Sequence, residues 1–184
     1  FLTCCASPIF GPDGRLLGVL DISGDYRRSH CHTLGLVRLS SGMVERRLFE
    51  SMYAKDILVG FHNRRDCLSS PREGLAAVSA DGQVLAINRS GLALLGIRRS
   101  DGVRRDFSMV FESSLATLVD QARRDPHTPI ELGINGQRLH VQLRGQLPPL
   151  AVTGRIYDEP SAPRLPRRPE APPAATLTLD TLNT

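Results

Sequence analysis

Residues 32–52, HTLGLVRLSSGMVERRLFESM, are predicted to form one long amphipathic helix to which the rest of the chain is attached. Five of its residues, spaced alternately by three and four, fall on one side as in a short heptad seam: Leu34, Val37, Ser41, Val44 and Leu48. A second stripe, Leu36, Leu39 and Met43, lies beside the first. One stripe can pack on the chain's own sheet while the other meets a second copy, so we expect a connecting helix over 32–56 and a homo-oligomer formed through it. The alternative is a helix packed only on its own domain, because so few heptads are also compatible with an ordinary amphipathic helix.

Two apolar runs before this helix, 2–10 and 16–22, predict a β-hairpin. They are separated by Gly11-Pro12-Asp13-Gly14, in which proline presets φ, aspartate bonds to the local backbone and glycine accepts a positive φ. The second run is apolar on both faces at its centre, which predicts that the sheet is covered on both sides. The helix that begins near His32 is the nearest candidate cover.

The segment 8–24, PIFGPDGRLLGVLDISG, is followed by Tyr26-Arg27 and by HTLGLV at 32–37. The turn, the strand and the start of the helix in this stretch resemble the end of the GAF sensor domain of bacterial sigma-54-dependent transcriptional activators. The resemblance is greatest to the acetoin-catabolism regulator group. The resemblance implies that residues 1–31 are the C-terminal strands of a GAF-like domain. It also implies a central ATPase and a Fis-type helix-turn-helix in the complete protein.

A second module begins near residue 74 with another hairpin. The apolar runs 75–79 and 83–88 flank Asp81-Gly82, a pair that is a strong short signal for a hairpin turn. Asn88 stands where a helix N-cap belongs, and Gly96 is placed to end that short helix. This order of strand, turn, strand, cap and helix resembles the opening of a PAS domain.

A third hairpin completes the expected module. The runs 130–134 and 138–143 enclose Asn135-Gly136, again a turn pair between alternating apolar residues. The order of the elements predicts a PAS-like domain over 74–146, preceded by a linker over 57–73. Between the hairpins the apolar spacing predicts further helical pieces at 107–111 and 115–122.

The composition changes from residue 147 onward. Eight of the chain's prolines lie in this part: Pro148, Pro149, Pro160, Pro163, Pro166, Pro169, Pro172 and Pro173. Such a composition favours extended conformations over a packed core, so we expect a disordered Pro-rich linker over 147–175. The last residues, 176–184, resemble the lead-in to the missing ATPase domain. The predicted fold class is α+β: the C-terminal part of a GAF domain, a connecting helix, a PAS-like antiparallel sheet with short helices, and the Pro-rich tail.

Charge and cysteine usage exclude several functions. The net charge is +4, and Lys55 is the only lysine among basic residues that occur as scattered arginine pairs rather than as the stripe of a nucleic-acid groove. The four cysteines lack metal-binding spacing and fit free thiols in a reducing, cytoplasmic compartment: Cys4, Cys5, Cys31 and Cys67. We therefore expect no metal site. No apolar run approaches the roughly 20 residues of a membrane helix, so no membrane contact is expected.

The sequence holds no recognisable catalytic motif. There is no nucleophile elbow and no phosphate-binding P-loop. The histidines are spread over different expected elements: His30, His32, His62, His127 and His140. The resemblance to a PAS domain implies that haem would need an axial histidine in the later helix of that domain, whereas His127 follows Pro126 in an expected loop. The flavin-adduct cysteine motif is also absent. We expect no catalytic residues, no enzyme activity and no cofactor; cofactor-binding residues stay unknown, and an apolar pocket for a small-molecule ligand stays open.

These features predict a sensory and regulatory N-terminal segment of a bacterial transcriptional activator. It would pass a ligand or partner signal to a downstream ATPase, and it would reach RNA polymerase sigma-54 and DNA only through domains missing from this chain. The alternative is the sensor segment of a histidine kinase or of a cyclic-nucleotide signalling enzyme, because GAF and PAS modules serve several outputs. A P-loop downstream would favour the first reading, and a kinase or cyclase motif the second.

Overall fold

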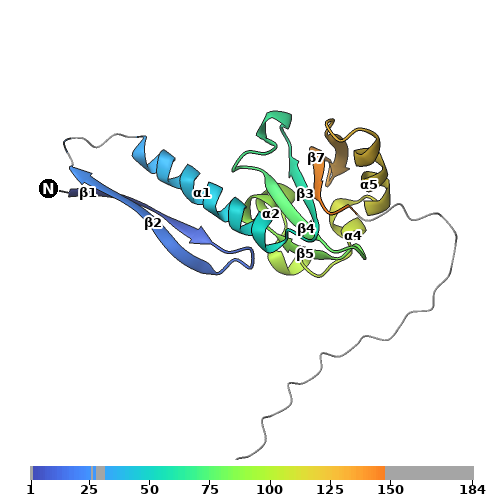
Figure 1. Cartoon of the computed structure of the whole chain (residues 1–184), viewed down its shortest axis with the longest axis horizontal. Coiled ribbons are helices and arrows are strands. Elements are labelled where there is room, and N and C mark those ends of the chain that lie inside the picture. The colour runs from blue at the N-terminus through green and yellow to red at the C-terminus, as the bar shows by residue number, and fades with distance from the viewer. Residues whose placement is uncertain (1, 26, 28–31, 148–184) are drawn as a thin grey trace, which may run out of the picture. The chain divides into compact units, whose positions relative to one another are not determined.

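The computed structural model describes residues 2–25, 27 and 32–147. The expected Pro-rich linker beyond Leu147 and the expected lead-in at 176–184 lie outside the described residues. The described elements, in chain order, are β1 (Leu2–Phe10), β2 (Leu16–Asp25), α1 (Thr33–Met52), β3 (Ile57–His62), the 3₁₀ turn η2 (Arg65–Cys67), β4 (Gly74–Val78), β5 (Val84–Ile87), α2 (Arg89–Leu95), α3 (Arg99–Gly102), α4 (Phe107–Phe111), α5 (Leu115–Arg124), β6 (Ile130–Ile134) and β7 (Gln137–Gly145) (Figure 1).

Strands β1 and β2 form the predicted hairpin and make a two-stranded antiparallel sheet of their own. Its turn closes through the Gly14 amide, which donates to the Gly11 carbonyl over 2.9 Å, while Gly14 itself takes a positive φ of 83°. The Asp13 carboxylate accepts from the Arg15 amide at 3.0 Å. The expected cover on both faces is not seen among the described residues, because Leu16, Leu17 and Val19 of β2 stay more than half exposed.

Helix α1 confirms the long helix predicted over 32–52, and it lies against the hairpin (Figure 1). The expected connecting helix over 32–56 is shorter than predicted, because Tyr53 ends it and residues 53–56 form a turn. The predicted seam is divided between two environments: Val37 and Ser41 are buried within the chain, whereas Leu34 and Val44 are exposed. The fully buried residue of the last turns is Phe49, which the seam did not include. The second stripe faces away from the described part of the chain. Its three side chains are about half exposed: Leu36 by 56%, Leu39 by 49% and Met43 by 57%.

Strand β3 is the main departure from the sequence prediction. We expected a linker over 57–73, but Ile57–His62 is a buried strand in the middle of a five-stranded sheet with the order β5-β4-β3-β7-β6. It pairs antiparallel with β4 on one side and with β7 on the other. Its run ILVGFH is apolar on both faces, and only a strand covered on both sides buries such a pattern.

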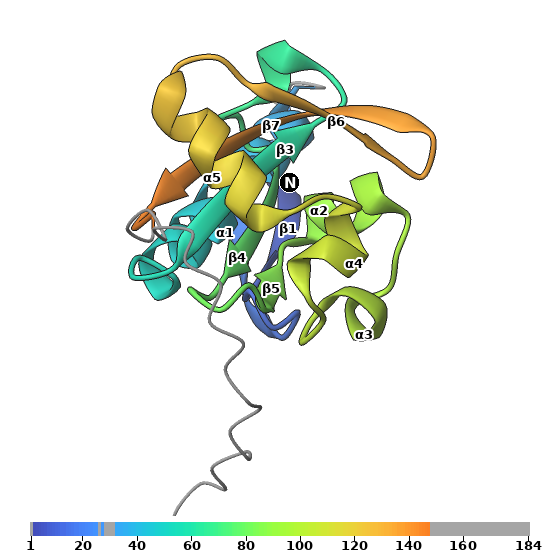
Figure 2. The same ribbon diagram turned by 90° about the vertical axis from the view of Figure 1, so that its right-hand side faces the viewer.

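Both faces of this sheet are covered. One face carries Ile57, Val59 and Phe61 of β3 and packs against residues of α2, α4 and α5. Helix α5 crosses in front of the sheet in Figure 2. The other face carries Leu58 and packs against Phe49 of α1, which lies behind the sheet in the same view. The α+β class predicted from the sequence is therefore correct.

Three local signals in this module are confirmed: the cap of α2, the turn between β6 and β7, and the helices α4 and α5. The Asn88 side chain caps α2 by accepting from the Gly91 amide at 2.7 Å, and Gly96 ends that helix in the left-handed conformation. Asn135 and Gly136 both have positive φ in the turn between β6 and β7, as the predicted hairpin requires. The helices predicted at 107–111 and 115–122 are α4 and α5.

Candidate functional site

Helix α1 is bonded to the hairpin through Glu45. One carboxylate oxygen of Glu45 accepts a hydrogen bond from the Phe10 amide at 2.8 Å, at the end of β1. The hairpin turn also comes near the C-terminal end of the helix. Burial, and after it the carboxylates of Asp56 and Asp13, raise the pKa of Tyr53, and Asp13 belongs to that turn. The hairpin is thus held to α1 by a specific polar contact.

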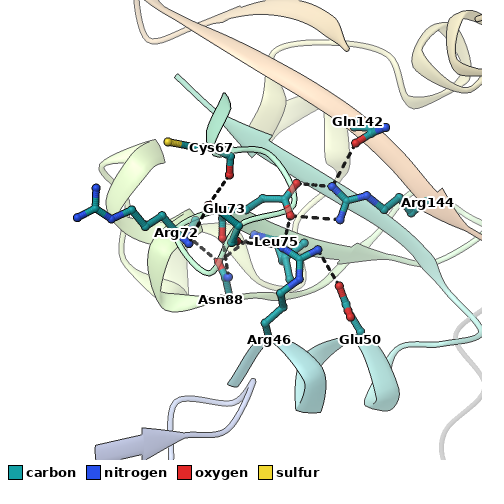
Figure 3. Close-up of polar contacts among 11 residues, drawn as sticks. Arg46, Glu50, Cys67, Arg72, Glu73, Leu75, Asn88, Gln142 and Arg144 are labelled. Carbon is teal, nitrogen blue, oxygen red and sulfur yellow. Dashed lines mark hydrogen bonds and ion pairs between the residues drawn. The ribbon is translucent and has the colours of Figure 1, made fainter. Parts of the chain in front are cut away.

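The next residue, Arg46, ties the same helix to the five-stranded sheet through a buried carboxylate. Glu73, just before β4, has a side chain with no exposed surface. Arg46 Nη1 lies 2.5 Å from Glu73 Oε2, and Arg46 Nη2 lies 2.9 Å from Glu50 Oε1. Arg144 of β7 donates to the same carboxylate, with Nη1 3.2 Å from Oε2 and Nη2 bonded to Oε1 (Figure 3).

We call Arg46, Glu73 and Arg144 the Glu73 cluster. A carboxylate taken out of water is costly unless its oxygens are satisfied, and here both oxygens accept from guanidinium groups. The two arginines come from α1 and β7, while the carboxylate precedes β4. The cluster therefore fixes one helix against two strands that are not neighbours in the sheet.

Space for this carboxylate is provided by Gly60 at the centre of β3. A Cβ atom at position 60 would overlap Glu73 Oε1 and would lie 2.9 Å from Arg144 Nη2, closer than real Cβ atoms come. A glycine inside a strand commonly marks such a close approach. Gly60 is thus explained by the buried charge beside it rather than by a turn.

Asn88 extends the polar network from the cluster to α2. Its Oδ1 atom accepts from the amides of Leu75 at 2.9 Å and Gly91 at 2.7 Å, and its Nδ2 atom donates to the Glu73 carbonyl at 3.0 Å (Figure 3). The asparagine therefore caps α2 and at the same time holds the start of β4. Any displacement of the Glu73 backbone would be felt at the helix N-terminus.

The interior on the opposite face of the sheet is filled by aromatic rings. Phe61 of β3 meets Phe111 edge to face at 5.2 Å between ring centroids, and Phe107 stacks on Phe111 at 4.5 Å. All three rings are at most 1% exposed. These rings fill the space between the sheet and the helices at this point.

The histidines and cysteines singled out in the sequence are not brought together. His30 and Cys31 lie outside the described residues, and within the described ranges no group of three His, Cys, Asp or Glu side chains could hold a metal ion. His62 ends β3, where its Nδ1 accepts from the Arg64 amide at 3.0 Å and burial lowers its pKa. His140 lies on β7, 3.7 Å from Glu131. Cys4, Cys5 and Cys67 are free thiols.

In the part of the chain that the structure describes, no helix combines the length and apolar character needed to cross a bilayer.

The class defined so far is an α+β chain in which a hairpin and a five-stranded sheet are both bonded to one helix. No family model matches the sequence. The chain is 28% identical over 111 residues to a protein of Clostridium beijerinckii described as a signal-transduction and transcriptional-control protein. The matched region is 60% of this chain and spans only 18% of that protein's length, so the chain shares sequence with part of a regulatory protein.

A structural comparison gives a distant match. The crystal structure of the E. coli DhaR(N)-DhaL complex aligns over 77% of this chain and 54% of the matched chain, with 14% sequence identity and a TM-score of 0.24.

Proposed function

We propose that this chain is the sensory and regulatory segment of a longer bacterial transcriptional activator of the sigma-54-dependent type. The sequence shared with the C. beijerinckii transcriptional-control protein supports a regulatory role. The resemblance of residues 8–24 to the acetoin-catabolism regulator group supports the finer assignment. RNA polymerase and DNA would be contacted through an ATPase and a DNA-binding domain that are not in this chain.

The observation that carries this proposal is the attachment of α1 to both modules through consecutive residues. Glu45 accepts from the hairpin at Phe10, and Arg46 pairs with Glu73 beside the five-stranded sheet. A signal that moves the hairpin would pull on α1, and α1 would pull on the Glu73 cluster. Such coupling works only if the signal stabilises one of two arrangements over the other, since contact alone shifts no equilibrium.

We propose that the two modules are the end of a GAF-like domain and a PAS-like domain. The hairpin and α1 both keep apolar side chains exposed on the surfaces where they do not contact each other. Such exposed apolar surface fits a fragment of a larger sensor fold. The second module has the Asn88 cap that its resemblance to a PAS opening implies. Strand β3 would belong to this PAS-like module, because it pairs with β4 and β7.

Self-association through α1 is part of the same proposal. Leu36, Leu39 and Met43 make one exposed stripe on the side of the helix away from Val37 and Ser41. An apolar stripe of this spacing is suited to packing against the same helix of a second copy.

Met43→Glu would place a charge in that contact, so we expect a weaker dimer, measured as a lower mass by light scattering. Arg38→Gln, on the exposed surface, should leave the mass unchanged. A wild-type chain that is monomeric at all concentrations would contradict the dimer.

The decisive experiment for the function is a reporter assay with the complete open reading frame. Transcription from its target promoter should require the sigma-54 factor, and a kinase or cyclase domain after residue 184 would contradict the proposal.

Arg46→Gln keeps the Arg144–Glu73 pair but removes the bond from α1, so the response to the inducing signal should be lost while the protein stays folded. Arg38→Gln is the matched control. An unchanged response in Arg46→Gln would show that the signal does not pass through the cluster.

A further inference from the structure

A cleft of about 280 Å³ lies where the hairpin turn, α1 and the start of the short helices meet. The residues that line it come from three segments that are far apart in the sequence. The turn contributes Phe10, Gly11, Pro12 and Gly14, helix α1 contributes Glu45 and Phe49, and the last part contributes Asn88, Arg89 and Arg99. Small-molecule sites in proteins commonly form in this way, at the junction of separate elements, with a mostly apolar wall and a few polar groups.

Two guanidinium groups give this cleft its charge. The Arg89 guanidinium lies over the Phe10 ring, 5.2 Å from the centroid. Arg99 Nη1 donates to the carbonyls of Ile87, at 3.2 Å, and Pro12. Among the residues that the structure describes, no carboxylate lies within ion-pair distance of either group. Of the described residues that line the wall, only Glu45 is acidic, and one of its oxygens already accepts from the Phe10 amide.

We propose that this cleft binds a small organic carboxylate with a flat apolar body. A guanidinium matches a carboxylate by two parallel hydrogen bonds, and Arg89 makes no such bond to a described residue. The rings of Phe10 and Phe49 and the ring of Pro12 would contact the apolar body. The carboxylate of the ligand would lie toward Arg89 and Arg99 and away from Glu45.

The location gives such a ligand a regulatory consequence. It would touch the turn at Phe10, helix α1 at Phe49 and the start of α2 at Arg89, so it would bind best when these three parts hold one arrangement. This inference deepens the proposed function, since it names the chemical class of the signal. It rests on that proposal only for its consequence, because binding itself can be measured on the isolated chain.

The test is a titration of the 184-residue chain with sodium benzoate, followed by the backbone amide shifts of Gly11 and Gly14. We expect saturable binding with a dissociation constant on the order of 1 mM or tighter, as for a ligand with few atoms. Benzamide has the same shape without the charge and should bind about tenfold more weakly or not at all. Equal binding of benzoate and benzamide, or no saturable shift with benzoate, would overturn the proposal.

Two variants assign the binding to the cleft. Arg89→Gln should weaken benzoate binding about tenfold, since a charge-assisted bond is lost. Arg98→Gln is the matched control, because Arg98 is outside the cleft and pairs with Asp101 at the surface, so its affinity should equal that of the wild type. An affinity unchanged in Arg89→Gln, or lowered as much in Arg98→Gln, would contradict the site. Benzoate binding together with a sigma-54-independent promoter would leave the site standing and refute the proposed function alone.

Discussion

The hairpin and the centre of the five-stranded sheet look alike in sequence and differ in burial. Leu16, Leu17 and Val19 of β2 are exposed by 56–59%, whereas Ile57 and Val59 of β3 are exposed by at most 1%. Both are short apolar runs. The difference is that β3 has a paired strand on each side and a cover on each face, while β2 has one partner strand, β1, among the described residues. An apolar strand thus indicates burial only when enough of the fold surrounds it.

The largest expected effect tests this difference directly. Phe61→Ala should lower the free energy of unfolding by about 4 kcal/mol, because a fully buried ring is replaced by a cavity. Leu17→Ala in the hairpin should change it by less than about 0.5 kcal/mol, because that side chain is already largely in water. Urea unfolding of both variants gives the comparison. Similar losses in the two would mean that the hairpin is buried in solution.

A second variant asks whether the buried charge stabilises the sheet. Glu73→Ala leaves Arg46 and Arg144 facing each other without their shared acceptor, so we expect a loss of about 3 kcal/mol. The control is Glu131→Ala on β6, whose carboxylate is half exposed and lies 3.7 Å from both Arg138 and His140. Exposed pairs of this kind contribute about 0–1 kcal/mol. Equal unfolding midpoints for the two variants would show that the Glu73 cluster does not stabilise the fold.

The third prediction compares two glycines of the sheet module. Gly82 has a φ of 87° in the turn between β4 and β5, so Gly82→Val should cost about 2 kcal/mol through backbone strain. Gly133 lies in β6 with open space where a side chain would begin and no positive φ, so Gly133→Val should be neutral. Thermal melting of both variants measures the contrast. A melting temperature preserved in Gly82→Val would argue that the turn can rearrange.

The smallest expected effect is a pH dependence at the end of β3. Burial lowers the pKa of His62 below its usual 6.5, so a proton binds the unfolded chain more tightly than the folded one. The stability from the neutral ring is complete above pH 6.5 and is lost as the pH falls through the lowered pKa. The wild type should therefore lose more melting temperature between about pH 7.5 and about pH 5 than His62→Gln does. Parallel profiles for the two proteins would exclude His62 as the source.

The sequence predicts those features that depend on neighbouring residues. The turn at Gly14, the cap at Asn88 and the Asn135-Gly136 pair act within a few positions, so their conformations follow from residue type. The role of β3 could not be predicted in this way, because its two partners lie in β4 and β7 and a short apolar run after a helix looks like the helix's continuation or a linker.

The Glu73 cluster was missed for a related reason. A lone glutamate beside a linker suggests a solvated charge, and nothing near it in sequence identifies Arg46 and Arg144 as its partners. One signal was available, since Gly60 interrupts an otherwise apolar run and a glycine there often makes room for another group. That signal indicates a close approach but does not say which group approaches, so the candidate site needed the three-dimensional structure.

The central position of β3 in the sheet affects how the chain folds during its synthesis. Ile57 pairs with Gly145, so a ribosome releases the middle strand long before one of its two neighbours exists. Until β7 emerges, β3 can pair only with β4 and leaves an apolar edge unprotected. Late closure of such a distant pair slows folding and leaves an intermediate prone to aggregate. Nascent chains stopped before residue 137 should therefore depend on chaperones more than the finished protein does.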